Sequence, residues 1–262
     1  QMLGKLLKYE FKSLMNNLGV LYLVWLSLTL ITAVLPKASK YTSEFVENLL
    51  HVVWAISFIA AIIMTLVVVI DRRFYKNFYG AEGYFTLALP VKISTHIWSK
   101  VIASTVWMVI TAFVGIFIMM IVSIATNGPD SYHQIKMFMN ERPAEARAII
   151  IFLFEVLLLG VVYISRFLLK TLACINLSVQ FSSFKSLLQG VFFVVLTIAE
   201  VYAAIVVTGH LSGDFALNLA VNSNQIRIAQ YGVGGIILLQ VVECAIYFLA
   251  SNYLMKNRLN LE

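Results

Sequence analysis

Five charged side chains stand out because they fall inside long apolar stretches of the sequence. They are two cations and three carboxylates: Arg166, Lys170, Glu155, Glu200 and Glu243. If such a stretch crosses a bilayer, a charge within it costs a few kcal/mol or more, so it is normally paired or faces a water-filled cavity. These residues therefore either tie helices together as ion pairs or line a polar route, and the sequence leaves both interpretations open.

Depth along the predicted helices suggests which of these charges meet. Counted from the cytoplasmic helix ends, Arg166 and Glu200 both lie about 20 Å deep, and Lys170 and Glu243 both lie about 15 Å deep. We therefore expect two buried pairs, Arg166 with Glu200 and Lys170 with Glu243. Glu155 has no partner at its depth, and we expect it near the outer headgroup level.

No other set of side chains has the spacing of a catalytic or metal site. The four histidines fall at the ends of apolar stretches or in loops: His51, His96, His133 and His210. An intramembrane hydrolase needs His and Glu, or Ser and a base, gathered at one depth, and no such spacing occurs. Cys174 and Cys244 lie inside apolar stretches and are interpreted as small apolar residues. We expect neither an enzyme nor a metal site.

A nucleotide site is not expected on this chain either. The phosphate-binding pattern G-x-x-x-x-G-K-[ST] is absent, and the glycine-rich segment at 232–235 has no Lys after it. Energy for any active process must come from another subunit or from an ion gradient.

The elements that must position the charges are membrane-spanning helices. Of the 262 residues 61% are hydrophobic and 12% are charged, and the mean hydropathy is +0.89. A water-soluble domain needs far more polar surface, whereas about 20 apolar residues are what a spanning helix requires. Six stretches qualify, at about 18–35, 49–70, 97–126, 148–180, 187–208 and 226–254. The sequence therefore predicts an all-α polytopic membrane protein with six transmembrane helices.

The distribution of Lys and Arg sets the orientation of these helices. Thirteen of the 19 cations fall on the side that holds both termini and the loop at 71–96. Positively charged loops stay in the cytoplasm, so both termini are predicted to be cytoplasmic, in a multi-pass protein of the plasma membrane. The net charge of +6 reflects this bias and contact with anionic lipid, and we expect no nucleic-acid partner.

Residues 1–17 have the pattern of an amphipathic helix ahead of the transmembrane domain at 18–262. Apolar side chains recur at spacings of three and four, at Leu3, Leu7, Phe11, Leu14 and Leu18. A polar stripe separates them, formed by Lys5, Lys8, Lys12 and Asn16. We expect an interfacial helix whose lysines reach the headgroups and whose Leu and Phe face sinks into the acyl boundary. A simple amphipathic lead-in to the first span is the alternative.

The inner loop exposes more apolar surface than a solvated connector tolerates. Its large apolar residues are Tyr79, Tyr84, Phe85, Leu87 and Leu89. Such a surface is usually covered by a partner or by lipid. A partner protein on the cytoplasmic side is one interpretation, and an aromatic belt at the membrane interface is the other.

The loop also carries a family resemblance. The segment at 82–91, EGYFTLALPV, followed by Ser99-Lys100, resembles the GYLTxTLPV loop of permease subunits of ABC-2 type exporters in Gram-positive bacteria. The closing segment at 256–262, KNRLNLE, is similar to their basic end. The chain departs from this family at 180–185, QFSSFK, where many relatives have a Gly and a more basic turn.

The resemblance implies a division of labour between subunits. Two permeases, expected to form a homodimer, would provide the path, and two separate cytoplasmic ATPase subunits would bind ATP and Mg and dock on the loop through a short coupling helix. The docking residues carried over are Tyr75, Tyr79, Glu82, Tyr84, Phe85, Thr86 and Leu87. The resemblance points to an exported peptide toxin or antimicrobial, with drugs or ions as alternatives, and the small outer loops and apolar spans suit an amphipathic substrate.

Two other functions remain open from the sequence. A gradient-driven secondary transporter or channel would use the buried glutamates for protons, but neither an inverted repeat nor paired Gly- or Pro-broken helices are seen. A membrane anchor that recruits an ATPase or sensor without transporting is the third.

Overall fold

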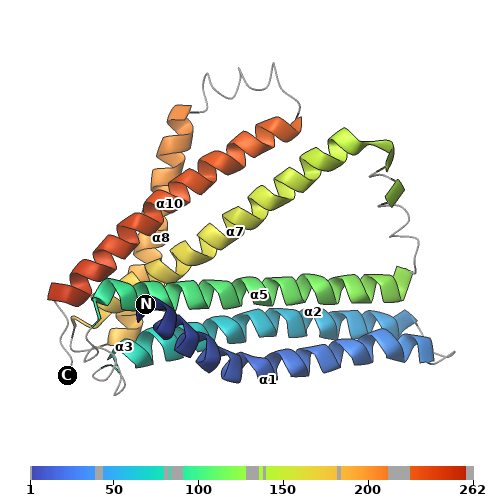
Figure 1. The fold of residues 1–262 in the computed structure, drawn as a ribbon, viewed down its shortest axis with the longest axis horizontal. Coiled ribbons are helices and arrows are strands. Elements are labelled where there is room, and N and C mark those ends of the chain that lie inside the picture. Colours follow the sequence, from blue (N-terminus) through green and yellow to red (C-terminus); the bar gives the residue numbers. More distant parts are fainter. Residues whose placement is uncertain are drawn as a thin grey trace. The chain divides into compact units, whose positions relative to one another are not determined.

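A computed structural model of the protein describes residues 2–38, 44–79, 83, 91–127, 136–137, 140–181, 184–211 and 225–257. In these ranges the regular structure is helical throughout (Figure 1). The helices are α1 (Met2–Ala38), α2 (Glu44–Val67), the π-helix η1 (Val68–Lys76), α3 (Asn77–Tyr79), α5 (Ile93–Asn127), α7 (Pro143–Ser178), α8 (Lys185–Leu211) and α10 (Gln225–Asn257).

Four of these helices contain a segment long and apolar enough to cross a bilayer. The segments are Ile93–Phe117, Ala146–Ser178, Lys185–Val206 and Gln230–Asn257. A fifth is present if the two halves of α1, Leu3–Asn16 and Leu18–Ile31, are taken as one bent span. The apolar part of the second predicted span is shorter, Ala55–Ile70. An all-helical membrane protein is therefore supported with four to five spans, and a total of six, with 49–70 as a full span, stays a prediction, as does the orientation.

The N-terminal helix differs from the expected one in what its apolar face contacts. Leu3–Asn16 continues into Leu18–Ile31 through a bend of 41°, at the boundary predicted between the interfacial helix and the first span. Leu14 is fully buried, and the Phe11 ring lies 6.4 Å from the ring of Trp107 on α5. This part of the Leu and Phe face thus packs on protein, where the sequence predicted contact with acyl chains.

The chain divides into two compact units, and the first comprises Gln1–Glu82 and Trp98–Pro143. Its helices α1, α2 and α5 pack through aromatic rings. Tyr22 stacks on Trp107 at 6.2 Å and hydrogen-bonds Thr111, and Trp25 lies 5.4 Å from Phe58. These contacts bring α1 against both α2 and α5 (Figure 1).

The second unit comprises Gly83–Ile97 and Ala144–Glu262, and its long helices are α7, α8 and α10. Phe167 and Phe193 join α7 to α8 edge to face, with ring centroids 5.7 Å apart. The Asn176 amide donates to the Ser251 carbonyl and joins α7 to α10. Large apolar side chains such as Phe154 and Leu238 are exposed on these helices, as expected where a helix faces lipid.

The connection from α7 to α8 contains a backbone feature that the sequence pattern hid. Phe184, just before α8, has a φ of 57°, in the left-handed region that favours glycine. It lies in the 180–185 segment where the chain departs from the ABC-2 permease pattern.

Candidate functional site

The second unit brings four charges together from three helices. Arg166 and Lys170 lie four residues apart on α7, so both side chains leave the same face of that helix. Glu200 comes from α8 and Glu243 from α10. Two cations thus meet two carboxylates among helices that are otherwise apolar.

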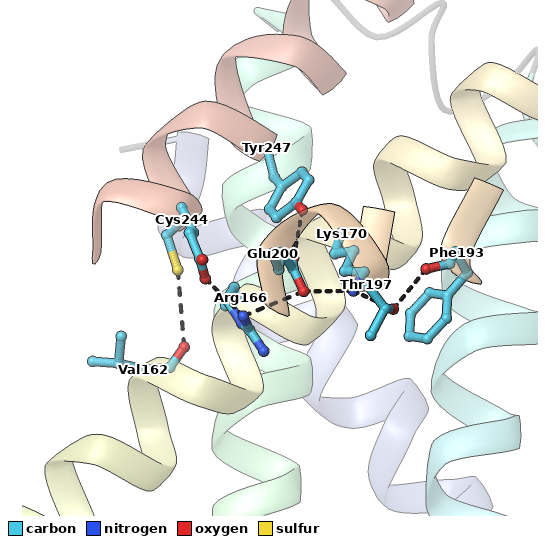
Figure 2. A network of polar contacts seen from close by, with 9 residues as sticks. Val162, Arg166, Lys170, Phe193, Thr197, Glu200, Cys244 and Tyr247 are labelled. Carbon is cyan, nitrogen blue, oxygen red and sulfur yellow. Dashed lines mark hydrogen bonds and ion pairs between the residues drawn. The ribbon is translucent and has the colours of Figure 1, made fainter. Parts of the chain in front are cut away.

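The ion pairs form a continuous chain through these four residues, of which Figure 2 labels Arg166, Lys170 and Glu200. Arg166 Nη1 lies 2.6 Å from Glu243 Oε2 and 3.4 Å from Glu200 Oε2. Lys170 Nζ lies 2.7 Å from Glu200 Oε2. Arg166 therefore bridges the two carboxylates, and Glu200 bridges the two cations.

Two further polar side chains complete the network. Lys170 Nζ donates to Thr197 Oγ1 at 2.7 Å, and Thr197 Oγ1 donates to the Phe193 carbonyl at 2.6 Å. The Tyr247 hydroxyl donates to Glu200 Oε1. Lys170 Nζ also lies 4.5 Å from the centre of the Phe193 ring, within reach of a cation–π interaction. Glu200 therefore accepts from donors on both neighbouring helices (Figure 2).

The four charged side chains of this network are largely buried, and their formal charges balance. The side-chain exposed fractions are 4% for Lys170, 11% for Glu200, 12% for Arg166 and 25% for Glu243. The formal charges sum to zero, and direct pairing lowers the cost of holding them away from water. Glu243 is the most exposed member, and its only ion pair in the described structure is with Arg166.

The structure corrects half of the predicted pairing. The Arg166–Glu200 pair is confirmed, but the expected Lys170–Glu243 pair is wrong, because Lys170 binds Glu200 and Glu243 binds Arg166. Counted from the observed helix ends, Glu243 lies about 21 Å from Asn257 and Lys170 about 12 Å from Ser178, so their depths do not match. Glu200 lies about 22 Å from Lys185 and still pairs with Lys170, so counts from helix ends do not fix which side chains meet.

Sequence reasoning missed Thr197 and Tyr247, although a signal was present. Thr197 lies three residues before Glu200 on α8, and Tyr247 lies four residues after Glu243 on α10. Side chains at these spacings share a helix face with the charge, so they are the first candidates to satisfy it.

Glu155 is not part of this network. It lies on α7, about 12 residues from the helix start, and its Oε2 atom is buried with no hydrogen-bond partner among the residues that the structure describes. The expected headgroup-level position of Glu155 stays a prediction.

Only two of the predicted docking residues lie in the described part of the chain. Tyr75 is in η1 and Tyr79 in α3, with ring centroids 6.5 Å apart. Burial raises the pKa of the Tyr79 phenol. The other predicted docking residues lie outside the described residues: Glu82, Tyr84, Phe85, Thr86 and Leu87.

A second buried ion pair lies beside this segment, in the first unit. Lys100 Nζ on α5 is 2.9 Å from Glu10 Oε1 on α1 and 5.0 Å from the centre of the Phe78 ring on α3. The Lys100 side chain is 1% exposed, and Phe74 and Phe78 are fully buried. This junction of Glu10, Phe78 and Lys100 joins α1, α3 and α5, and Glu10 was not predicted as the partner of Lys100.

The cysteines and the potential metal ligands of the described residues offer little further chemistry. Both cysteines are free, and Cys244 Sγ lies 3.8 Å from the Val162 carbonyl oxygen. No group of three or more His, Cys, Asp or Glu suitable for a metal ion occurs within the ranges described.

Comparisons of the chain with protein-family models, with curated proteins and with solved structures give no match.

Proposed function

We propose that this chain is the permease subunit of an ATP-driven exporter of the ABC-2 type, which moves an amphipathic substrate such as a peptide toxin or antimicrobial out of the cell. The observation that carries the proposal is the inner loop at 82–91, with its resemblance to the docking loop of that family. The apolar helices support the membrane location, and the plasma membrane is part of the proposal.

The structure beside the loop suits a docking role. The chain enters the loop from α3, where Phe78 is fully buried, and leaves it toward α5, where Lys100 is buried and paired with Glu10. A loop mounted on packed, charge-paired helices passes the displacement of a bound partner into those helices instead of absorbing it. The Glu10–Phe78–Lys100 junction therefore supports coupling between a docked ATPase and the membrane helices.

The energy source follows from what the sequence lacks. Without a phosphate-binding loop, the chain depends on a partner for ATP hydrolysis. The proposal includes two ATPase subunits, which carry ATP and Mg, and two permease chains that form a homodimer around the path.

In this function the four-charge network holds helices together and also offers one charged group to the substrate. Its pairs hold α7, α8 and α10 together at a depth where unpaired charges are costly. Glu243, the most exposed member, is the group in the network best placed to meet a cationic part of a substrate.

A second candidate is a gradient-driven transporter or channel that uses intramembrane glutamates for protons. The observation that favours it is Glu155, whose buried Oε2 atom has no hydrogen-bond partner in the described structure. Transport driven by a proton gradient in the absence of ATP would support this candidate against the exporter.

The docking loop provides the test of the proposed function. Changing Tyr84 and Phe85 together to Asp places two charges on the apolar docking surface and should abolish copurification of the ATPase subunit. The matched control is Phe184→Asp, which changes an exposed aromatic residue outside the loop and should leave copurification intact. Full ATPase retention by the Tyr84, Phe85 double variant would place the docking site elsewhere.

A further inference from the structure

The first half of α1 carries an exposed row of lysines. Lys5, Lys8 and Lys12 are all exposed and recur at spacings of three and four, so they line one face of the helix. Tyr9 and Met15 lie at the two edges of this row and are 72% and 54% exposed. We call the face formed by these three lysines the lysine row.

The opposite face of the same turns is occupied by protein. Helical periodicity places Glu10 and Leu14 on the side away from the lysine row. Glu10 pairs with Lys100, and Leu14 is fully buried. The helix is therefore held through contacts to α5, and its lysine row points away from the protein.

We propose that Lys5, Lys8 and Lys12 form a binding site for anionic lipid headgroups at the bilayer surface. The three ammonium groups extend over about 10 Å of helix, which matches one or two phosphate-bearing headgroups. The flanking Tyr9 and Met15 place apolar surface at both edges of the row, where it contacts the glycerol and upper acyl region.

Charge and position favour lipid over an acidic protein as the occupant. The helix continues through a 41° bend into the apolar segment Leu18–Ile31, so a bilayer that surrounds this segment begins within a few residues of the row. Each Lys near an anionic surface strengthens binding by about fivefold, and the row supplies three. An acidic protein would have to compete with a surface that is always adjacent.

The lipid site is linked to the base of the docking loop, and this link rests on the proposed function. Glu10 projects from the back of the helix turns that carry Lys8 and Lys12, and it contacts the same Lys100 that lies over Phe78. Headgroups that fix the lysine row thereby fix Glu10, and with it the junction from which the loop emerges. Anionic lipid is expected to raise ATP hydrolysis by the assembled complex.

The binding step is tested without any ATPase. The purified full chain is mixed with dansyl-labelled phosphatidylglycerol or dansyl-labelled phosphatidylcholine, and energy transfer from its tryptophans reports binding. Wild type should prefer phosphatidylglycerol by at least tenfold at low salt, and the Lys5, Lys8, Lys12→Gln variant should lose most of that preference. The control variant Lys136, Arg142→Gln removes two exposed cations elsewhere and should keep it.

The outcomes separate this inference from the proposed function. Equal phosphatidylglycerol preference in wild type and the triple variant, with both folded by circular dichroism, would overturn the lipid site. A triple variant that keeps the preference but loses a bound protein would assign the row to a protein partner and also overturn it. If the triple variant loses the lipid preference but no ATPase is found in any purification, the lipid site is supported and the proposed exporter function is rejected.

Discussion

At the scale of single residues, Glu200 is the centre of the polar network. It accepts from Lys170 and Tyr247 and lies within ion-pair distance of Arg166, so it joins α7 and α10 to its own helix α8. Glu243 contacts only Arg166 among the ion pairs described. The two carboxylates should therefore differ in their contribution to stability.

This difference gives a direct prediction. Glu200→Gln leaves Lys170 without its carboxylate and should lower the free energy of unfolding by about 3–5 kcal/mol, the usual loss when one partner of a buried pair is removed. Glu243→Gln should lower it by about 1–3 kcal/mol, because Arg166 keeps Glu200. Thermal unfolding in mild detergent compares the two variants.

The double variant Lys170→Met, Glu200→Gln supplies the control. This double variant removes one positive and one negative charge, so it should recover much of the stability lost in Glu200→Gln. Recovery of stability without recovery of transport would show that the pair also serves the pathway. Equal losses for Glu200→Gln and Glu243→Gln would contradict the arrangement.

The network also shows how far the sequence predicts a site. Depth counting found the four charges and one correct pair, because the rise of a helix is fixed. It failed on Lys170 and Glu243 because a helix end that moves by three residues shifts the counted depth by about 5 Å. It failed also because equal counts do not place side chains of different helices at one level, since Lys170 pairs with Glu200 although their counts differ by about 10 Å. Thr197 and Tyr247 were missed because only charges were considered.

At the scale of elements, Gly115 on α5 lies close against α1 and α2. A Cβ atom at this position would lie 2.5 Å from Cε2 of Phe58 and 3.3 Å from Cη2 of Trp25. A larger side chain at position 115 would force the Phe58 ring to move, so a glycine suits the packing of α1, α2 and α5 here.

Gly115→Val should therefore destabilise the protein by about 1–3 kcal/mol more than the same change at an open glycine. Gly160→Val on α7 is the matched control, because nothing lies within 4 Å of a Cβ atom built at Gly160. This control variant changes helix propensity in the same way as Gly115→Val but creates no clash. Adding Phe58→Ala should partly rescue Gly115→Val. Equal thermal unfolding of the two valine variants would show that the three helices do not pack as described.

The elements themselves were predicted unevenly. The helices at 97–126, 148–180, 187–208 and 226–254 correspond to α5, α7, α8 and α10, because long apolar stretches specify helices strongly. The π-helical turn of η1 and the left-handed Phe184 were not predicted, since hydropathy carries no information on either. The contacts of Phe11 and Leu14 with protein were missed because an amphipathic pattern does not distinguish lipid from a neighbouring helix.

At the scale of the whole molecule, the chain consists of two helical units with different polar centres. The first holds the Glu10–Phe78–Lys100 junction, whose Phe78 and Lys100 flank the proposed docking loop in the sequence, and the second holds the four-charge network. Composition predicted a membrane protein because lipid must be the solvent for so many apolar side chains. Function could not be read from the fold in the same way, since the proposed docking surface would acquire its role only with a partner.

The central claim is that the chain works with a separate ATPase, and its assembly tests this most directly. A tag on the chain allows purification from native membranes in mild detergent, followed by native mass spectrometry and an ATP hydrolysis assay. We predict a complex of two 29.4 kDa permease chains with two ATPase subunits that hydrolyses ATP. A chain recovered without any ATPase, or a one-to-one complex that transports, would contradict the account.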